Sequence, residues 1–371
     1  MKKLGFGLMR LPMLEKDGKS EIDIEQMKEM VDSFIEHGFT YFDTAWMYCN
    51  FASERAVKEA LISRHKRDTF TLATKLHAGF VQCEEDRDRI FGEQREKTGA
   101  DFFDYYLLHA IGRESYEKYE KFHCFEWLSE KKKQGLVKHI GFSFHDTADL
   151  LDRILTEHPE AEFVKLQINY LDWESEGVQS RKCYEVARKH GKPVIVMEPV
   201  KGGTLAKLPP QAEKLMKEEN PDLSIPSWAI RFAAGLPGVM TVLSGMSNPE
   251  QLSDNMSYME DFKPLSDTES AIIDKVVTII NSGNSIPCTA CSYCTDGCPV
   301  KIPIPQYFSL YNADIIENKE GWTAQMEYYD NLTKTSGKAS ECIECGQCEG
   351  MCPQKLNIRS YLKQVAERFE K

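Results

Sequence analysis

Short apolar runs alternate with longer amphipathic segments from Leu4 to about Val242, and this alternation constrains the fold of the chain more than any other feature. Most of the runs lack a polar residue at every second position, which is typical of strands buried on both faces of a parallel sheet. Eight such runs cover residues 4–9, 39–43, 70–76, 103–109, 137–143, 163–169, 193–199 and 238–244.

Helical segments with recognisable start and stop signals lie between these runs. Asp23 is expected to cap a helix that stops at Gly38, and Ser53 is expected to cap the next one. A longer helix is expected over 116–135, where lysines and a glycine mark its end, and another ends at Gly191. Eight strands alternating with about eight helices favour a (β/α)8 TIM barrel over a doubly wound open sheet, on the strength of the count.

The composition excludes some classes of partner. The chain has 371 residues, of which 42% are hydrophobic and 28% charged, as in an ordinary globular enzyme. Its formal net charge of −12 argues against a nucleic-acid partner, because phosphate binding needs a basic face. No apolar run is long enough to span a membrane, and the start MKKLGFGLMRLP lacks the apolar core of a signal peptide, so we expect a cytoplasmic protein without a membrane partner.

Two copies of the motif C-x2-C-x2-C-x3-C-P stand near the C-terminus, at 288–299 and 342–353. Three thiolates at this spacing wrap one face of an iron–sulfur cube, and in two-cluster proteins the fourth ligand comes from the other motif. Zinc or disulfides would not explain four cysteines and a proline twice over. The pattern therefore predicts two [4Fe–4S] clusters, one held by Cys288, Cys291, Cys294 and Cys352, the other by Cys342, Cys345, Cys348 and Cys298.

The stretch 283–287 reads as a domain boundary, so we expect one domain over 1–282 and a second over 283–371. The second domain has a helical insert between its motifs and a helix at its end, and it resembles the helical ferredoxin-like domains fused to many oxidoreductases. Adjacent clusters suit electron exchange with a redox protein partner, and a purely structural role is the alternative. The other four cysteines are expected to be buried or half-buried thiols.

Four chemically active residues lie at the ends of successive strands. Asp43 and Tyr48 follow the second run, Lys75 ends the third and His109 ends the fourth. Alone, each has an ordinary structural explanation, such as a helix cap or a solvated lysine. In a barrel, however, such residues share one mouth. There the ammonium would lower the pKa of the tyrosine, the carboxylate would hold the lysine, and a neutral histidine would hydrogen-bond a carbonyl oxygen as hydride arrives.

These residues resemble the catalytic tetrad of the aldo-keto reductases. The segment DTAWMY, followed by Glu54, and the opening LGFGLMRLP resemble motifs of that family, and the resemblance covers about 1–265. It implies that Asp43, Tyr48, Lys75 and His109 interconvert a small carbonyl compound and its alcohol with NAD(P)H.

The same resemblance implies a nicotinamide nucleotide site formed by the later strands and loops. Phe144 stands where many members of the family have asparagine, so that contact is either missing or supplied by His145, and a methionine replaces a stacking aromatic residue. The implied contacts are Ser143 and Gln167 for the carboxamide, Met197 beside the ring, Lys201, Gly202 and Gly203 for the pyrophosphate, and Asp254 and Asn255 for the adenine.

The implied site lacks the usual cations for a 2′-phosphate. Gly245 and Gln251 stand where NADP-dependent members often have lysine and arginine, so we expect NADH to suit the site at least as well as NADPH.

Two alternatives to a nicotinamide-dependent reductase remain open. A hydride carries two electrons and a [4Fe–4S] cluster passes one, so a flavin such as FMN in the barrel mouth would reconcile the two halves. A non-catalytic electron carrier or redox-responsive binding module is the other alternative. The loops that choose a substrate do not reveal its identity.

Overall fold

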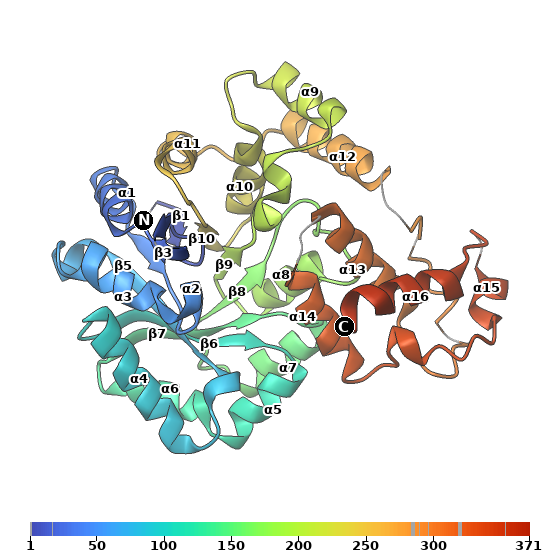
Figure 1. Ribbon diagram of the computed structural model, residues 1–371, viewed down its shortest axis with the longest axis horizontal. Helices are drawn as coiled ribbons and strands as arrows, with labels where there is room; N and C mark the ends of the chain where they lie inside the picture. The colour runs from blue at the N-terminus through green and yellow to red at the C-terminus, as the bar shows by residue number, and fades with distance from the viewer. Residues whose placement is uncertain are drawn as a thin grey trace.

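Eight parallel strands close into a barrel in the order β1-β10-β9-β8-β7-β6-β5-β4, with β1 paired to β4 (Figure 1). The computed structural model describes residues 2–16, 18–282, 286–288, 290–295, 297–317, 321–352 and 354–371. The barrel strands are β1 (Leu4–Gly7), β4 (Tyr41–Asp43), β5 (Thr71–His77), β6 (Phe103–Ile111), β7 (Val137–Phe144), β8 (Phe163–Gln167), β9 (Val194–Met197) and β10 (Val239–Ser244). Each run chosen from the sequence overlaps one of these strands, three of which (β5, β6 and β7) extend one or two residues beyond it, and the (β/α)8 fold is confirmed.

Helices surround the barrel and bury the outward-facing side chains of its strands (Figure 1). They are α1 (Ile24–Glu36), α3 (Ser53–Val57), α4 (Glu84–Thr98), α5 (Arg113–Lys121), α6 (Cys124–Lys133), α7 (Ala148–Glu157), α8 (Ser180–Lys189), α9 (Pro210–Glu219), α10 (Ile225–Gly235), α11 (Pro249–Met259) and α12 (Asp267–Ser282). Asp23 caps α1 as expected, because its side chain accepts a hydrogen bond from the backbone of Gln26.

The inward-facing side chains form layers, and these layers position the site. One apolar layer consists of Tyr41, Ala73, Leu107, Phe163, Ile195 and Leu243, one residue from each of six strands. Because side chains alternate along a strand, the residue two positions further on faces the same interior. On four of these strands that residue is polar, namely Asp43, Lys75, His109 and Lys165. The interior therefore changes from apolar to ionisable toward the C-terminal ends of the strands.

Three local features differ from the sequence-based expectations. An exposed hairpin, β2 (Met13–Lys16) and β3 (Lys19–Ile22), was not expected, because its residues bury no apolar face. The helix expected over 116–135 is interrupted at His123, which has a left-handed backbone (φ 47°). Ser53 is not an N-cap: it lies inside α3, and its hydroxyl donates to the carbonyl of Leu8 at 2.9 Å.

The C-terminal segment is helical, as expected, and has its own apolar core. Its helices are α13 (Ile304–Glu317), α14 (Ala324–Thr333), α15 (Gln347–Met351) and α16 (Ile358–Phe369), drawn in red in Figure 1. Tyr307, Phe308, Tyr329, Leu362 and Phe369 belong to that core. Across the described ranges of the chain, no helix has the length and apolarity needed to cross a membrane.

The C-terminal helices pack on the ends of the barrel strands that carry the ionisable layer. Asn331 of α14 donates to the backbone oxygen of His145, just beyond β7, at 2.8 Å. Ser309 of α13 hydrogen-bonds Ser175, in the loop beyond β8, at 3.0 Å. Lys334, directly after α14, pairs with Glu114 beyond β6 at 2.8 Å. The C-terminal domain therefore covers part of the barrel mouth.

Candidate functional site

The structure brings Asp43, Tyr48, Lys75 and His109 together at the barrel mouth. The ammonium of Lys75 donates to Oδ1 of Asp43 at 2.6 Å and lies 3.3 Å from the hydroxyl of Tyr48. The rings of Tyr48 and His109 meet edge to face, with centroids 5.9 Å apart. Asp43 and Lys75 are almost fully buried, whereas Tyr48 and His109 are half-buried, so the two groups nearest the mouth remain accessible.

A left-handed turn follows Tyr48 directly. Cys49, Asn50 and Phe51 all have positive φ, at 50°, 52° and 65°. Asparagine tolerates this conformation, but an aromatic residue there is an outlier that costs on the order of 1–3 kcal/mol. The turn directly follows Tyr48, whose phenol contacts Lys75, and backbone strain of this kind is concentrated at functional sites.

The pKa values of the site differ in one respect from the expectation. Burial raises the pKa of Tyr48 to about 12, and the ammonium of Lys165 is the main opposing influence. The expected net lowering of this pKa by Lys75 is therefore wrong for the protein without ligands. Burial also lowers the pKa of His109 well below its usual value, and Lys75 adds to this effect. At neutral pH the site contains a protonated phenol and a neutral imidazole.

Lys165 of β8 is a residue of this site that the sequence analysis did not single out. Its ammonium donates to Oδ1 of Asp43 at 2.9 Å, the same oxygen that accepts from Lys75. Its side chain is 4% exposed. One signal was available in the sequence: Lys165 lies two positions before Gln167 on the same strand, so the two side chains share a face.

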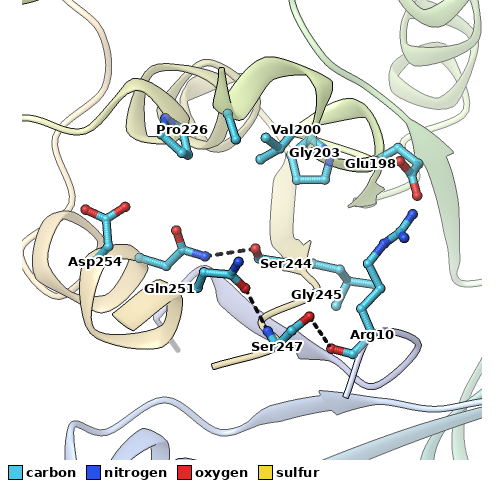
Figure 2. Close-up of a pocket in the computed structure, with 15 residues that line it drawn as sticks. Arg10, Glu198, Val200, Gly203, Pro226, Ser244, Gly245, Ser247, Gln251 and Asp254 are labelled. Carbon is cyan, nitrogen blue, oxygen red and sulfur yellow. Dashed lines mark hydrogen bonds between the residues drawn. The ribbon is translucent and has the colours of Figure 1, made fainter. Parts of the chain in front are cut away.

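A cavity of about 330 Å³ lies beyond the ends of β9 and β10 (Figure 2). Four of the expected nucleotide contacts line it, together with both positions where cations are missing. Figure 2 also shows Arg10 reaching toward Glu198, two residues that the sequence analysis did not assign to the site. The expected residues in the lining are Gly202, Gly203, Asp254, Asn255, Gly245 and Gln251.

The polar side chains of this cavity are held by their neighbours. Ser224 donates to the carboxylate of Asp254 at 2.7 Å, and Asn255 donates to the hydroxyl of Ser244 at 2.8 Å. Gly203 has a φ of 101°, a conformation that favours glycine, so the backbone can approach a ligand closely there. These polar groups and the exposed glycine backbone are the ones that could hold the sugar and phosphate parts of a nucleotide.

The remaining expected contacts lie elsewhere at the mouth. The hydroxyl of Ser143 accepts from the backbone N–H of Ala110 at 2.7 Å, and the side chain of Gln167 donates to Asp172 at 3.0 Å. Oε1 of Gln167 is buried, and the described residues offer it no hydrogen bond, so it is available to a carboxamide. Met197 ends β9, half-buried.

Lys201 is turned away from the cavity. Its ammonium lies between both carboxylate oxygens of Asp172, at 2.7 and 2.9 Å. With its amide oriented to suit its neighbours, Gln325 of α14 accepts from the same ammonium at 2.8 Å and donates to Glu317 at 2.9 Å. A role for Lys201 in binding a pyrophosphate stays a prediction, because this buried network already uses its charge.

The eight motif cysteines line two small cavities in the C-terminal domain. Cys288, Cys291, Cys294 and Cys352 line one, and Cys298, Cys342, Cys345 and Cys348 line the other. These are the two sets expected from cross-ligation between the motifs, and eight soft thiol donors in two groups of four fit [4Fe–4S] clusters. Within the described ranges, no three histidine, cysteine or acidic side chains meet as ligands of a single metal ion.

The four other cysteines do not form a cluster. Cys124 and Cys183 are buried and Cys49 is half-buried, as expected, but Cys83 is exposed at the start of α4.

Two family models match the chain. The model described as the aldo/keto reductase family matches residues 3–278, and one described as a 4Fe-4S dicluster domain matches residues 287–357. The first match spans well over half of the chain. The protein therefore belongs to the aldo-keto reductase family and is an oxidoreductase, with a 4Fe-4S dicluster domain that follows the barrel in the sequence.

Individual relatives are distant. The chain is 24% identical to the uncharacterized oxidoreductase YqkF of Bacillus subtilis over 292 residues, which is 69% of this chain and 90% of the relative. An aldo-keto reductase from Klebsiella pneumoniae in complex with NADPH has a TM-score of 0.58 at 20% identity, over 74% of this chain and 90% of that one. The holo form of an aldo-keto reductase from Bacillus halodurans has a TM-score of 0.58 at 23% identity, over 74% and 91%. These two likenesses show the fold.

Proposed function

We propose that the barrel reduces an aldehyde or ketone to its alcohol, and runs the reverse reaction, with Tyr48 as the proton donor. The observation that carries this proposal is the position of the Lys75 ammonium between the carboxylate of Asp43 at 2.6 Å and the phenol of Tyr48 at 3.3 Å. A phenol in contact with a fixed cation can give up its proton, because the cation stabilises the phenolate that forms.

The other members of the tetrad support this transfer. Asp43 fixes Lys75 by a charge-assisted hydrogen bond. His109 stays neutral because burial lowers its pKa, so its imidazole can hydrogen-bond a carbonyl oxygen without competing for the proton. A bound nicotinamide would supply the hydride, with the free oxygen of Gln167 available to its carboxamide.

We expect NADH to suit the site at least as well as NADPH. Gly245 and Gln251 line the cavity without a charge, and the carboxylate of Asp254 lines the same cavity (Figure 2). Arg10 brings one cation to the same cavity, although Glu198 faces it. A 2′-phosphate would therefore meet one cation, Arg10, which also faces Glu198, where NADP-dependent members of the family often have a lysine and an arginine.

The C-terminal domain, which we place at 283–371, is proposed to hold two [4Fe–4S] clusters that exchange electrons with a redox protein partner. Its contacts with the loops beyond β6, β7 and β8 bring it to the catalytic end of the barrel.

The proposal is tested on protein purified without oxygen. We expect NADH to be consumed in step with aldehyde, with no flavin released on denaturation. A released yellow chromophore and clusters bleached by NADH would instead favour a flavin in the barrel. If neither nucleotide supports reduction of any aldehyde or ketone in a broad panel, the proposal is wrong.

A further inference from the structure

Two buried ammonium groups face a single carboxylate inside the barrel. Lys75 and Lys165 both donate to Oδ1 of Asp43, at 2.6 and 2.9 Å. Their side chains are 0% and 4% exposed. A buried charge without a partner costs several kcal/mol, and one carboxylate compensates one ammonium. One of the two lysines is therefore in excess of what the ion pair needs.

The excess charge belongs to Lys165. Lys75 also donates to the backbone oxygen of Thr44 at 2.5 Å and contacts Tyr48, so its hydrogen-bonding capacity is used. Among the described residues, Lys165 has one hydrogen bond, to Asp43, which leaves two of its N–H groups without a protein partner. A lysine that serves only structure would be expected to satisfy them.

The field of this ammonium acts on the phenol of Tyr48. Lys165 is the largest influence that lowers the pKa of Tyr48, and the phenol in turn raises the pKa of Lys165. Lys165 also lowers the pKa of His109. The same ammonium is thus coupled to both groups that would touch a carbonyl oxygen.

Other charges facing these groups partly oppose or support this effect. Asp43 on β4 and Glu198 beyond β9 raise the pKa of Tyr48, while burial is the largest cause of its high value. Burial is the main cause of the lowered pKa of Lys165; Asp43 opposes it, and Lys75 on β5 adds to it. Both lysines share the carboxylate of Asp43, so one positive charge remains to offset a phenolate.

We propose that Lys165 is a second cation of the proton-donor site and a positioning residue for Tyr48. This inference rests on the proposed carbonyl reduction. When Tyr48 gives its proton to the carbonyl oxygen and hydride adds to the carbonyl carbon, one negative charge is left on the phenolate. Lys165, with its unused N–H groups, stabilises that charge together with Lys75.

The test replaces Lys165 by methionine, which keeps the length and removes the charge, and by glutamine, in case the first variant does not fold. A fluorinated tyrosine, whose phenol ionises nearer neutral pH, is placed at position 48, and its ionisation is followed by 19F NMR in the protein with oxidised clusters. We expect the pKa of the probe to rise by about one unit or more in K165M, because one unit corresponds to about a tenfold change in the ionisation constant. Alcohol oxidation, which needs the phenolate, should then move to higher pH and slow about tenfold at neutral pH.

Arg231→Met is the matched control, because it removes a different buried cation, the partner of Glu269, with a side chain 8% exposed. It should lower stability without moving the pKa of the probe. An unchanged probe pKa in K165M and K165Q would overturn the inference. The NMR measurement needs no turnover. If the wild type reduced no carbonyl compound, the proposed function would be wrong, but the effect of Lys165 on the pKa of the probe at position 48 would still be measured.

Discussion

Asp43 is the residue on which the charges of the barrel interior depend. Burial alone would raise the pKa of its carboxyl, but Lys165 and Lys75 hold that pKa below its usual value of 3.8. The folded protein therefore keeps the carboxylate ionised more readily than the unfolded chain does. Its contribution to stability is full above the ordinary pKa and is lost as the pH falls through the lower, folded value.

Asp43→Asn should lower stability by about 3–5 kcal/mol, because it leaves two buried ammonium groups without their carboxylate. We expect the same loss at about pH 7 and about pH 5, since the carboxylate is ionised at both. Urea denaturation of the protein with intact clusters measures this. A loss that fades between these two pH values would show that the carboxyl ionises in that range, contrary to the direction of its pKa.

The four residues that meet at the barrel mouth could be predicted to do so from the sequence because they follow recognisable strands. Lys165 was missed because a single charged residue inside the apolar run 163–169 looks like an exception until the inward face of the strand is known. The high pKa of Tyr48 was missed for a related reason: motifs reveal the neighbouring charge, while burial, the larger effect here, depends on the folded mouth.

At the scale of the strands, close packing between β7 and β8 holds Ser143 and Lys165 side by side. They are register partners, and Gly141 lies two pairs below, opposite Phe163. A Cβ at Gly141 would lie 2.4 Å from the backbone oxygen of Phe163, a contact that only movement of the strand can relieve. The glycine therefore sets the distance between the two strands beneath the site.

Gly141→Ala should lower stability by about 1–3 kcal/mol, as overpacking in a core does. It should also reduce turnover, because β8 carries Lys165. Gly92→Ala on α4 is the matched control: its Cβ would meet nothing within 4 Å, so the helix should gain about 0.5–1 kcal/mol. The unfolding midpoints of the two variants should move in opposite directions, and a shared direction would refute this explanation of Gly141.

The existence of the barrel strands could be predicted from the apolar runs, but the exposed hairpin and the break between two helices could not. All eight strands bury apolar side chains, so their composition identifies them in the sequence. The hairpin of β2 and β3 is exposed, and the break between α5 and α6 depends on the left-handed backbone of His123, which composition does not signal.

At the scale of the molecule, the C-terminal domain joins distant parts of the chain to the barrel mouth. Each of its two thiol-lined cavities takes three cysteines from one motif and one from the other. The motif spacing allowed this arrangement to be predicted. The contact of α14 with His145 and Lys201 could not be, because it depends on how two separately packed cores meet.

Double variants test the cross-ligation. Cys298→Ala combined with Cys342→Ala removes two ligands from one cavity, so we expect iron to fall from about eight to about four atoms per chain. Cys298→Ala combined with Cys288→Ala removes one ligand from each cavity and should reduce iron further. If each motif instead held its own cluster, the second pair would keep about four iron atoms and the first would not. Iron analysis and the cluster spectrum of anaerobic protein distinguish the two patterns.

The most direct test of the account is a single-turnover measurement on Tyr48→Phe, which removes one hydroxyl and keeps the ring. Anaerobic wild-type and variant protein, matched in iron content and loaded with NADH, are mixed with an aldehyde that the wild type reduces, and the oxidation of NADH is followed. The account predicts a rate about 10²–10⁴-fold lower in the variant, with nucleotide binding unchanged. A variant that oxidises NADH at the wild-type rate would contradict the role of Tyr48 as proton donor.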